Sequence, residues 1–201
     1  MVLGITGGIG SGKGLATEFF RRRGAEVVDA DEVSREVMAA GSPVVGEVAA
    51  VFGPGLLRKD GSLDRQALAA RVFGDAEAVA RLNALTHPAI MEAMRGRVEA
   101  AARAGVRLVC VVAPLLLEAG GRGMVDRVLV VTAEEGERIR RVMARDGLAE
   151  EQVRARMAAQ MAPEEQAREA DWVVDTTAGR AEAQRQLARV WREVRREMGG
   201  D

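Results

Sequence analysis

The 201-residue sequence contains few aromatic residues, one cysteine and almost no net charge. Aromatic residues make up 3% of the chain and the formal net charge is −1, so the sequence has neither the basic field nor the stacking platforms typical of nucleic-acid-binding proteins. No apolar run reaches the roughly 18 residues of a membrane-spanning helix, and the first residues lack the basic segment of a signal peptide. The lone Cys110 cannot form an internal disulfide. We therefore expect a cytoplasmic globular protein without membrane or nucleic-acid partners. The composition does not determine the oligomeric state, for which we expect a monomer, with a weak oligomer as the alternative.

Lysine is also scarce. Of the 29 basic residues, two are lysines, Lys13 and Lys59, and the remaining 27 are arginines. Because the chain uses arginine for ordinary positive charge, a lysine indicates a position where a compact ammonium is needed.

Short apolar runs alternate with helical patterns in the order typical of a parallel sheet covered on both faces. The predicted strands are Val2–Thr6, Glu26–Asp29, Leu108–Ala113, Arg127–Thr132 and Trp172–Asp175.

The remaining segments are predicted to be mainly helical. The first helix is expected over Gly14–Arg23 and the last over Ala181–Met198, while residues 133–168 are expected to form two helices broken near Asp146-Gly147. Residues 31–104 are helical in pattern, with breaks at Gly41-Ser42-Pro43, Gly53-Pro54-Gly55 and Asp60-Gly61. The fold class is therefore α/β, a three-layer α/β/α arrangement with about five parallel strands. We expect one domain, with a core of residues 1–30, 106–133 and 170–201 and helical segments at 31–105 and 134–169.

A glycine-rich segment follows the first predicted strand. Gly7, Gly12 and Lys13 satisfy the pattern G-x-x-x-x-G-K, for which the composition predicts roughly 0.03 chance matches in the chain. Glycines let successive backbone N–H groups point inward as an anion site, the following helix adds its positive end, and the lysine reaches the β- and γ-phosphates. The segment is therefore a predicted P-loop that binds a nucleoside triphosphate.

One position departs from that pattern. Gly14 stands where a serine or threonine hydroxyl usually contacts Mg²⁺. We expect water, or the hydroxyl of Ser11 or Thr17, to take that place, or else a weaker metal site. The third predicted strand also ends in Ala113-Pro114 and supplies no carboxylate.

Two aspartates follow the second predicted strand. Since parallel strands end at the same sheet edge, Asp29 and Asp31 are expected near the phosphate loop. Asp31 is the candidate base for an acceptor hydroxyl, or an outer ligand of Mg²⁺. The alternative is that Asp31 only caps the helix that follows.

At this point the sequence resembles the dephospho-coenzyme A kinases. The resemblance covers essentially the whole chain, and it implies a P-loop kinase fold that phosphorylates the ribose 3′-hydroxyl of dephospho-CoA with ATP and Mg²⁺. Gly14 departs from this family's usual serine, and Thr176 from a common asparagine. The matching stretches are Leu3 to Lys13, Val28 to Asp31, Asp60 to Arg65, Leu82 to Pro88, Pro114 to Glu118, Val125 to Arg127, Arg141 and Arg145, Gln160, and Ala170-Asp171.

The resemblance also implies site residues, with residues 31–105 as the acceptor-binding insertion and residues 134–169 as a lid. Asp31 would be the base, with Lys13 and Arg141 acting on the phosphoryl group. Asp31, through water, is the one candidate metal ligand. The implied ATP-binding residues are Gly8, Gly10, Ser11, Gly12, Lys13, Gly14, Leu15 and Arg145; the implied acceptor-binding residues are Thr6, Asp31, Arg65, His87, Leu115 and Glu118.

Several of these residues have simpler interpretations. His87, followed by Pro88, could open a helix, and Arg65 could pair with Asp64 on the surface. Arg141 and Arg145 are four residues apart, so they are expected to point the same way, either as a clamp or as a solvated face. Outside the site, we expect packing roles for Met157, Met161 and Trp172, an inert buried thiol at Cys110, and a solvated helix end at Arg21–Arg23.

Three alternative functions bear on the same motif. Another small P-loop kinase, acting on a nucleoside monophosphate or a small alcohol, is the nearest alternative. A guanine-specific switch protein is excluded because its Asn-Lys-x-Asp motif needs an asparagine, and the single one, Asn83, precedes Ala84. A noncatalytic nucleotide-binding module, with magnesium chemistry lost at Gly14, would bind ATP without producing ADP.

Overall fold

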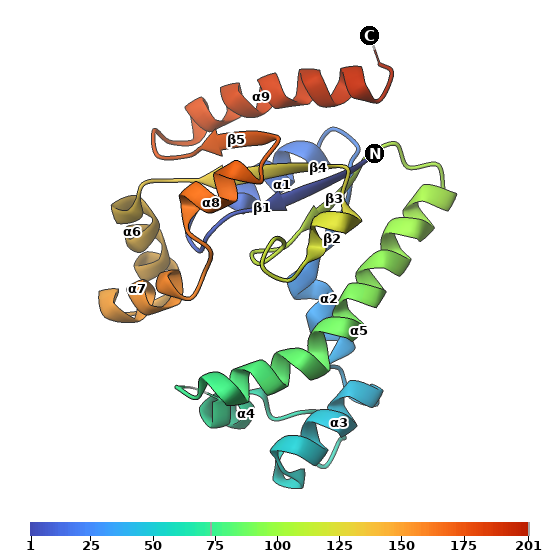
Figure 1. Ribbon diagram of the computed structural model, residues 1–201, viewed down its shortest axis with the longest axis vertical. Coiled ribbons are helices and arrows are strands. Elements are labelled where there is room, and N and C mark those ends of the chain that lie inside the picture. The colour runs from blue at the N-terminus through green and yellow to red at the C-terminus, as the bar shows by residue number, and fades with distance from the viewer. Residues whose placement is uncertain (73, 201) are drawn as a thin grey trace. The chain divides into compact units, whose positions relative to one another are not determined.

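The computed structural model describes residues 1–72 and 74–200. Its centre is a parallel sheet of five strands in the order β2-β3-β1-β4-β5 (Figure 1). The strands are β1 (Val2–Thr6), β2 (Glu26–Asp29), β3 (Val109–Val112), β4 (Arg127–Thr132) and β5 (Trp172–Asp175). The predicted α/β fold with five parallel strands is confirmed, and only β3 is one residue shorter at each end than expected.

β3 separates β1 from β2 in the sheet. β1 and β2 are parallel, but β3 lies between them, with Ile5 opposite Val112 and Asp29 opposite the same Val112. The ends of β1 and β2 therefore share one edge of the sheet without being neighbours. The loop that follows β1 and Asp29, the last residue of β2, therefore lie at the same edge.

The helices fall largely where the sequence predicts them. The first helix covers residues 13–21, slightly earlier than the expected 14–23. The helices are α1 (Lys13–Arg21), α2 (Ala30–Val37), α3 (Pro43–Phe52), α4 (Arg65–Val72), α5 (Ala76–Arg103), α6 (Glu135–Asp146), α7 (Glu150–Ala158), α8 (Pro163–Arg168) and α9 (Arg180–Glu197), with short 3₁₀ turns at Pro54–Leu56 and Gly121–Met124.

The expectation of two helices in residues 133–168 is wrong, because this segment holds α6, α7 and α8. The predicted break is present, with Gly147 in the left-handed conformation at the end of α6. A second break comes at Ala162, whose extended backbone precedes Pro163 at the first position of α8. Proline disfavours a helical conformation of the residue before it, so the Ala162-Pro163 pair was a stop signal in the sequence.

The described chain forms two compact units, one of Met1–Asp29 with Val98–Asp201 and the other of Ala30–Arg97. The first unit holds the sheet, and helices α1 and α9 pack on one face of it. Alternate strand residues, such as Leu3 and Ile5, point into that layer and are fully buried. On the other face Gly4 leaves room for Leu116, whose Cδ2 lies 2.5 Å from the place of a Cβ. Cys110 is buried in this core, which raises the pKa of its thiol to about 12, so the predicted inert thiol is confirmed.

The second unit contains α2, α3, α4 and most of α5 around its own apolar cluster. Val48 and Leu56 are almost completely buried there. His87 does not open a helix, as one interpretation held, because it lies inside the continuous α5 together with Pro88. Pro88 has no N–H for the carbonyl of Ala84, so it removes one hydrogen bond from the middle of this helix.

Candidate phosphate-binding site

The loop between β1 and α1 has the backbone conformation of a phosphate-binding loop. Gly7, Gly10 and Gly12 have φ values of 143°, 77° and 93°, a region that side chains other than glycine rarely occupy. Gly7 is further confined, because a Cβ at this position would lie 2.0 Å from the carbonyl oxygen of Val131 in β4. The first turn of α1 contains no acidic residue, so the positive end of the helix faces an anion without competition.

Lys13 is the first residue of α1, and its ammonium lies against the loop. Its Nζ donates to the carbonyl oxygens of Gly7 at 2.6 Å and Gly8 at 3.2 Å. A lysine held by loop carbonyls is placed beside the anion site before any ligand arrives. The predicted juxtaposition of loop and lysine is therefore present in the structure.

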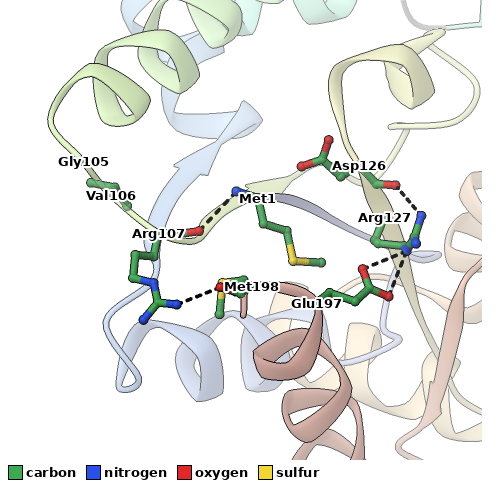
Figure 2. Close-up of a pocket in the computed structure, with 8 residues that line it drawn as sticks. All are labelled: Met1, Gly105, Val106, Arg107, Asp126, Arg127, Glu197 and Met198. Atoms are coloured by element: carbon green, nitrogen blue, oxygen red, sulfur yellow. Dashed lines mark hydrogen bonds and ion pairs between the residues drawn. The ribbon is translucent and has the colours of Figure 1, made fainter. Parts of the chain in front are cut away.

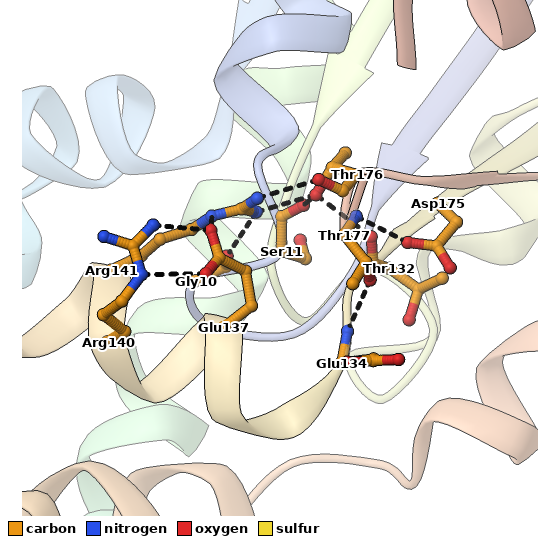
Figure 3. Close-up of polar contacts among 10 residues, drawn as sticks. All are labelled: Gly10, Ser11, Thr132, Glu134, Glu137, Arg140, Arg141, Asp175, Thr176 and Thr177. Carbon is orange, nitrogen blue, oxygen red and sulfur yellow. Dashed lines mark hydrogen bonds and ion pairs between the residues drawn. The ribbon is translucent and has the colours of Figure 1, made fainter. Parts of the chain in front are cut away.

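Three consecutive carbonyls of the loop are held by side chains from other parts of the first unit (Figure 3 shows the second and third). Arg138 donates from Nε to the oxygen of Ile9 at 2.9 Å, and Arg141 donates from Nη1 to the oxygen of Gly10 at 3.3 Å. Thr176 donates from Oγ1 to the oxygen of Ser11 at 2.8 Å.

These three hydrogen bonds orient the amides of the loop. In a trans peptide the C=O and the following N–H point in opposite directions, and the described chain has no cis peptide. Fixing the carbonyls of Ile9 and Ser11 therefore turns the N–H groups of Gly10 and Gly12 away from α6 and β5. Neither N–H makes a hydrogen bond within the described residues, so both are free to bind an anion.

Arg141 is the most connected of the three holding side chains (Figure 3). Its Nη1 and Nη2 donate to the hydroxyl and the carbonyl of Thr176 at 2.7 and 2.8 Å, and its Nε donates to Glu137 at 2.8 Å. Hydrogen bonds from Arg140 and then from Arg141 lower the pKa of Glu137 to about 2. Glu137 is thus an anion at neutral pH and neutralises much of the charge of Arg141.

Arg145 does not share the contacts that Arg141 makes with the loop and Thr176. It makes a two-pronged ion pair with the adjacent Asp146, with N–O distances of 2.7 and 2.9 Å, and about two thirds of its side chain is exposed. The expectation that the two arginines point the same way is therefore wrong in this structure. Residue spacing predicts the side of the helix from which a side chain starts, and the local acid decides where its end lies.

The described residues contain no group of three His, Cys, Asp or Glu side chains that could hold a metal ion. The two hydroxyls considered in place of the missing one at Gly14 are those of Ser11 and Thr17. The Oγ of Ser11 is buried and has no partner, and it lies only 2.9 Å from the place of a Cβ on Gly7, under the loop. Thr17 donates its hydroxyl to the carbonyl of Lys13 at 3.0 Å. A hydroxyl that donates to a carbonyl keeps lone pairs for a metal ion, so the Thr17 hydroxyl is compatible with the expected Mg²⁺.

Three predicted site residues lie in the second unit: Asp31, Arg65, and His87 of α5. Asp31 is the second residue of α2 rather than its cap, and its side chain is exposed. Arg65 begins α4 and donates to the carbonyl of Arg35 at 3.2 Å, while its expected partner Asp64 pairs with Arg58 instead. The surface pair of Arg65 with Asp64 was therefore a wrong interpretation.

The remaining predicted acceptor residues lie on or beside the segment after β3. Thr6 is fully buried and its hydroxyl donates to the carbonyl of Pro114 at 3.4 Å, so Thr6 connects β1 to that segment. Leu115 is 38% exposed, an unusual state for a leucine beside a buried Leu116. Glu118 accepts the N–H of Met161 at 3.0 Å, which connects the same segment to the chain between α7 and α8.

Arg138 was not singled out from the sequence. Arg138 is only 5% exposed. The signal was available: Arg138 precedes Ile139 and lies four residues before Val142, on the apolar side of α6. Gln160, matched through the resemblance, accepts the N–H of Ile9 at 2.8 Å, so both polar groups of Ile9 are held from outside the loop.

A hollow of about 580 Å³ lies at the edge of the sheet opposite the phosphate loop, where β1 and β4 begin (Figure 2). Its polar groups hold the chain ends together. The Met1 amine donates to the carbonyl of Arg107 at 3.2 Å, Arg107 donates to the carbonyl of Met198 at 2.8 Å, and Arg127 pairs with Glu197 at 3.1 Å. These contacts give the hollow a structural role.

Comparisons with known proteins agree with this geometry. A family model described as Dephospho-CoA kinase matches residues 1–182. The chain is 44% identical over 202 residues to the dephospho-CoA kinase of Moorella thermoacetica, covering 100% of this chain and 95% of the relative, and 40% identical to that of Geobacter sulfurreducens, covering 94% and 96%.

Solved structures share the fold. A Thermus thermophilus protein, 38% identical, superposes with a TM-score of 0.78 over 96% of this chain and 97% of its own. The dephospho-CoA kinase of Campylobacter jejuni, 24% identical, gives 0.66 over 96% of both chains, and a shikimate kinase of Bacteroides thetaiotaomicron, 14% identical, gives 0.51 over 96% and 98%.

A parallel sheet whose central strand runs into a lysine-bearing phosphate loop defines a P-loop kinase. The family match over most of the chain specifies which kind. The chain belongs to the dephospho-CoA kinase family.

Proposed function

We propose that the chain transfers the γ-phosphoryl group of ATP to the ribose 3′-hydroxyl of dephospho-CoA, giving CoA and ADP. The family phosphorylates dephospho-CoA to CoA in the last step of CoA biosynthesis, and the protein is a transferase. The observation that carries the reaction class is the loop itself, in which Lys13 and the free N–H groups of Gly10 and Gly12 are fixed beside one another. Phosphoryl transfer depends mainly on such positioning and on charge neutralisation.

The triphosphate binds to this loop in the proposal. The N–H groups of Gly10 and Gly12 and the positive end of α1 hold its oxygens, and Lys13 exchanges loop carbonyls for the β- and γ-phosphates. Arg141, held beside Gly10 by Thr176, is the cation proposed to stabilise charge on the transferring group.

Asp31 is the proposed general base for the acceptor hydroxyl. The support is its position two residues beyond Asp29, the last residue of β2, whose end shares the sheet edge with the end of β1. A carboxylate that accepts the hydroxyl proton as the new O–P bond forms contributes about 10²–10⁴-fold in rate. Arg65 and His87 are proposed to bind the acceptor, on the strength of the family resemblance.

Mg²⁺ is proposed as the metal, held by the phosphates and water with Asp31 as an outer ligand. It would supply neutralisation of phosphate charge. No helix among the described residues is long and apolar enough to cross a membrane. A cytoplasmic monomer without nucleic-acid partners remains our proposal, supported by the lone buried Cys110 and the near-zero net charge.

An acceptor panel tests the proposal. The purified protein is given Mg-ATP with dephospho-CoA, AMP or shikimate, and ADP formation is measured beside a reaction without acceptor. Selective ADP formation with dephospho-CoA, together with a CoA product phosphorylated at the 3′ position, is expected. Selective turnover of AMP or shikimate would replace the proposal by the alternative small-molecule kinase, and ATP binding without ADP formation would favour the noncatalytic module.

A further inference from the structure

Arg138 is a buried cation that touches the phosphate loop and forms no ion pair within the described residues. The residue is 5% exposed, and it makes no ion pair with any carboxylate in the described part of the chain. Burial lowers the pKa of its guanidinium, and Glu135 opposes that effect from a distance. Its one hydrogen bond of standard geometry goes from Nε to the carbonyl oxygen of Ile9, at 2.9 Å.

Stability does not explain a charge in this position. Removing a guanidinium from water has a large desolvation cost, and an apolar side chain of similar volume is often as stable or more stable at a buried site. The surroundings of the helix offer apolar partners, because Ile139 and Val142 pack with Val153 in a small core cluster between α6 and α7. The charge of Arg138 is therefore better explained by what it touches, which is the loop.

The guanidinium contacts the loop at two consecutive residues. Besides bonding the carbonyl of Ile9, its Nη2 lies only 2.2 Å from the place where a Cβ on Gly8 would stand. Gly8 has no positive φ, so a side chain at this position would meet the guanidinium of Arg138 rather than a backbone restriction. The loop and the arginine are thus matched in shape as well as in polarity.

We propose that Arg138 is a positioning residue for the triphosphate, acting through the peptide between Ile9 and Gly10. By holding the carbonyl of Ile9, it keeps the N–H of Gly10 aimed at the anion, and its unpaired charge adds a positive potential behind the loop. This inference rests on the proposed binding of ATP at the loop, but it is independent of which acceptor is used.

Arg138 and Arg141 differ in whether a carboxylate pairs with their charge. Arg141 bonds the next carbonyl, that of Gly10, but its Nε is paired with the Glu137 carboxylate at 2.8 Å. Arg138 has no such partner among the described residues, so more of its charge remains available to the ligand. Both arginines, three residues apart on α6, thus orient the loop, and Arg138 does so without a paired carboxylate among the described residues.

The test compares Arg138→Met, which removes the charge and the donor, with Arg138→Lys, which keeps the charge. Arg192→Met is the matched control, because Arg192 is an exposed arginine of α9, outside the segment expected to form the lid. Affinity for ATP and ADP is measured by calorimetry without acceptor, KM and kcat for both substrates by ADP formation, and Tm by circular dichroism.

We expect Arg138→Met to weaken ATP binding and to raise the KM for ATP by about tenfold, the loss of one hydrogen bond to a charged group. The KM for dephospho-CoA and the Tm should change little, and Arg138→Lys should recover part of the lost affinity. Arg192→Met should match the unmodified protein in every measurement.

Two results would overturn the inference. One is ATP affinity of Arg138→Met within twofold of the unmodified protein. The other is a loss that lysine does not recover and that only parallels a fall in Tm, which would make Arg138 a purely structural residue. Failure of the proposed function is a separate outcome, since it would show as absent turnover of dephospho-CoA by the unmodified protein while the ATP-binding measurement still decides the role of Arg138.

Discussion

The guanidinium of Arg141 donates two hydrogen bonds to Thr176, one to the hydroxyl at 2.7 Å and one to the carbonyl at 2.8 Å (Figure 3). The hydroxyl of Thr176 accepts from Arg141, and its single proton goes to the nearer of two carbonyls, that of Ser11 at 2.8 Å rather than that of Thr132 at 3.2 Å. One buried hydroxyl therefore joins α6, the end of β5 and the phosphate loop.

Thr176→Val should remove the hydrogen bonds of this hydroxyl while nearly preserving the volume of the side chain. It leaves the Ser11 carbonyl without its donor and Arg141 without one acceptor, so we expect the free energy of unfolding to fall by about 1–3 kcal/mol. The KM for ATP should rise because the loop amides lose orientation. Thr176→Ser keeps the hydroxyl and serves as the control in urea unfolding and steady-state kinetics. A valine variant with unchanged stability and an unchanged KM for ATP would show that the hydrogen bonds of the Thr176 hydroxyl contribute to neither.

Asp31→Asn should lower kcat by about 10²–10⁴-fold, because the amide cannot accept the hydroxyl proton, and leave the KM for ATP nearly unchanged. Lys13→Ala should lower turnover at least as much, since cationic stabilisation of a transferring phosphoryl group contributes about 10³–10⁵-fold. Both rates are measured by ADP formation with saturating dephospho-CoA. Glu32→Gln, a change at the next residue of α2, is the control. Unchanged kcat in Asp31→Asn would remove Asp31 from the role of base.

The sheet and the loop could be predicted from the sequence because local patterns determine them. The strand Val2–Thr6 is a continuous apolar run, and the Gly7–Lys13 spacing requires a particular backbone that only glycines permit. Four of the five strands begin and end at the predicted residues. The missed boundary at Ala162-Pro163 was also a local signal, but a weak one inside a long charged segment.

The sequence could indicate that Arg138 is buried, but not which groups the loop-holding side chains contact, because those groups are distant along the chain. Arg138 contacts Ile9 across 129 residues, and Thr176 contacts Ser11 across 165. Nothing in the charge pattern of α6 separates Arg138 from Arg140, although the first is buried and the second is exposed and paired with Glu137. Which arginine faces the loop depends on the packing of α6 in the fold.

Gly14→Ser should strengthen the response to magnesium. Gly14 is exposed, its φ is not positive, and no atom lies within 4 Å of the place of a Cβ, so a serine fits without strain. Its hydroxyl would replace one water of the metal, and we expect the Mg²⁺ concentration for half-maximal rate to fall on the order of tenfold. Gly14→Ala separates the hydroxyl from the added methyl group. Equal magnesium curves for the three proteins would show that water serves this position as well as serine.

Glu137 should stabilise the fold in a pH-dependent way. Its pKa is lowered from 4.5 to about 2 by Arg140 and Arg141, so the folded state favours the carboxylate. The stabilisation is complete above the unfolded pKa, near 4.5, and is lost as the pH falls from there toward 2. The difference in Tm between the unmodified protein and Glu137→Gln should therefore be constant from pH 8 to 5 and shrink below pH 4.5. A difference that grows on acidification would contradict this sign.

Gly8→Ala offers a separate test of the contact with Arg138. In the unmodified background the new methyl group would displace the guanidinium from the loop, because its place lies 2.2 Å from Nη2 and 2.8 Å from Cζ of Arg138. We expect ATP binding to weaken by about tenfold, the loss of one charge-assisted hydrogen bond. In an Arg138→Ala background that obstacle is gone, and the same substitution should weaken ATP binding less than about twofold.

Gly10→Ala is the matched control for this cycle, because it meets the backbone of residue 138 instead of its side chain. A Cβ there would lie 2.6 Å from the carbonyl oxygen of Arg138, at a φ of 77° that disfavours alanine. Its cost should therefore persist when Arg138 is replaced by alanine. ATP affinities of the single and double variants, measured by calorimetry, give both coupling energies. Equal costs of Gly8→Ala in the two backgrounds would mean that Gly8 is required for a reason other than Arg138.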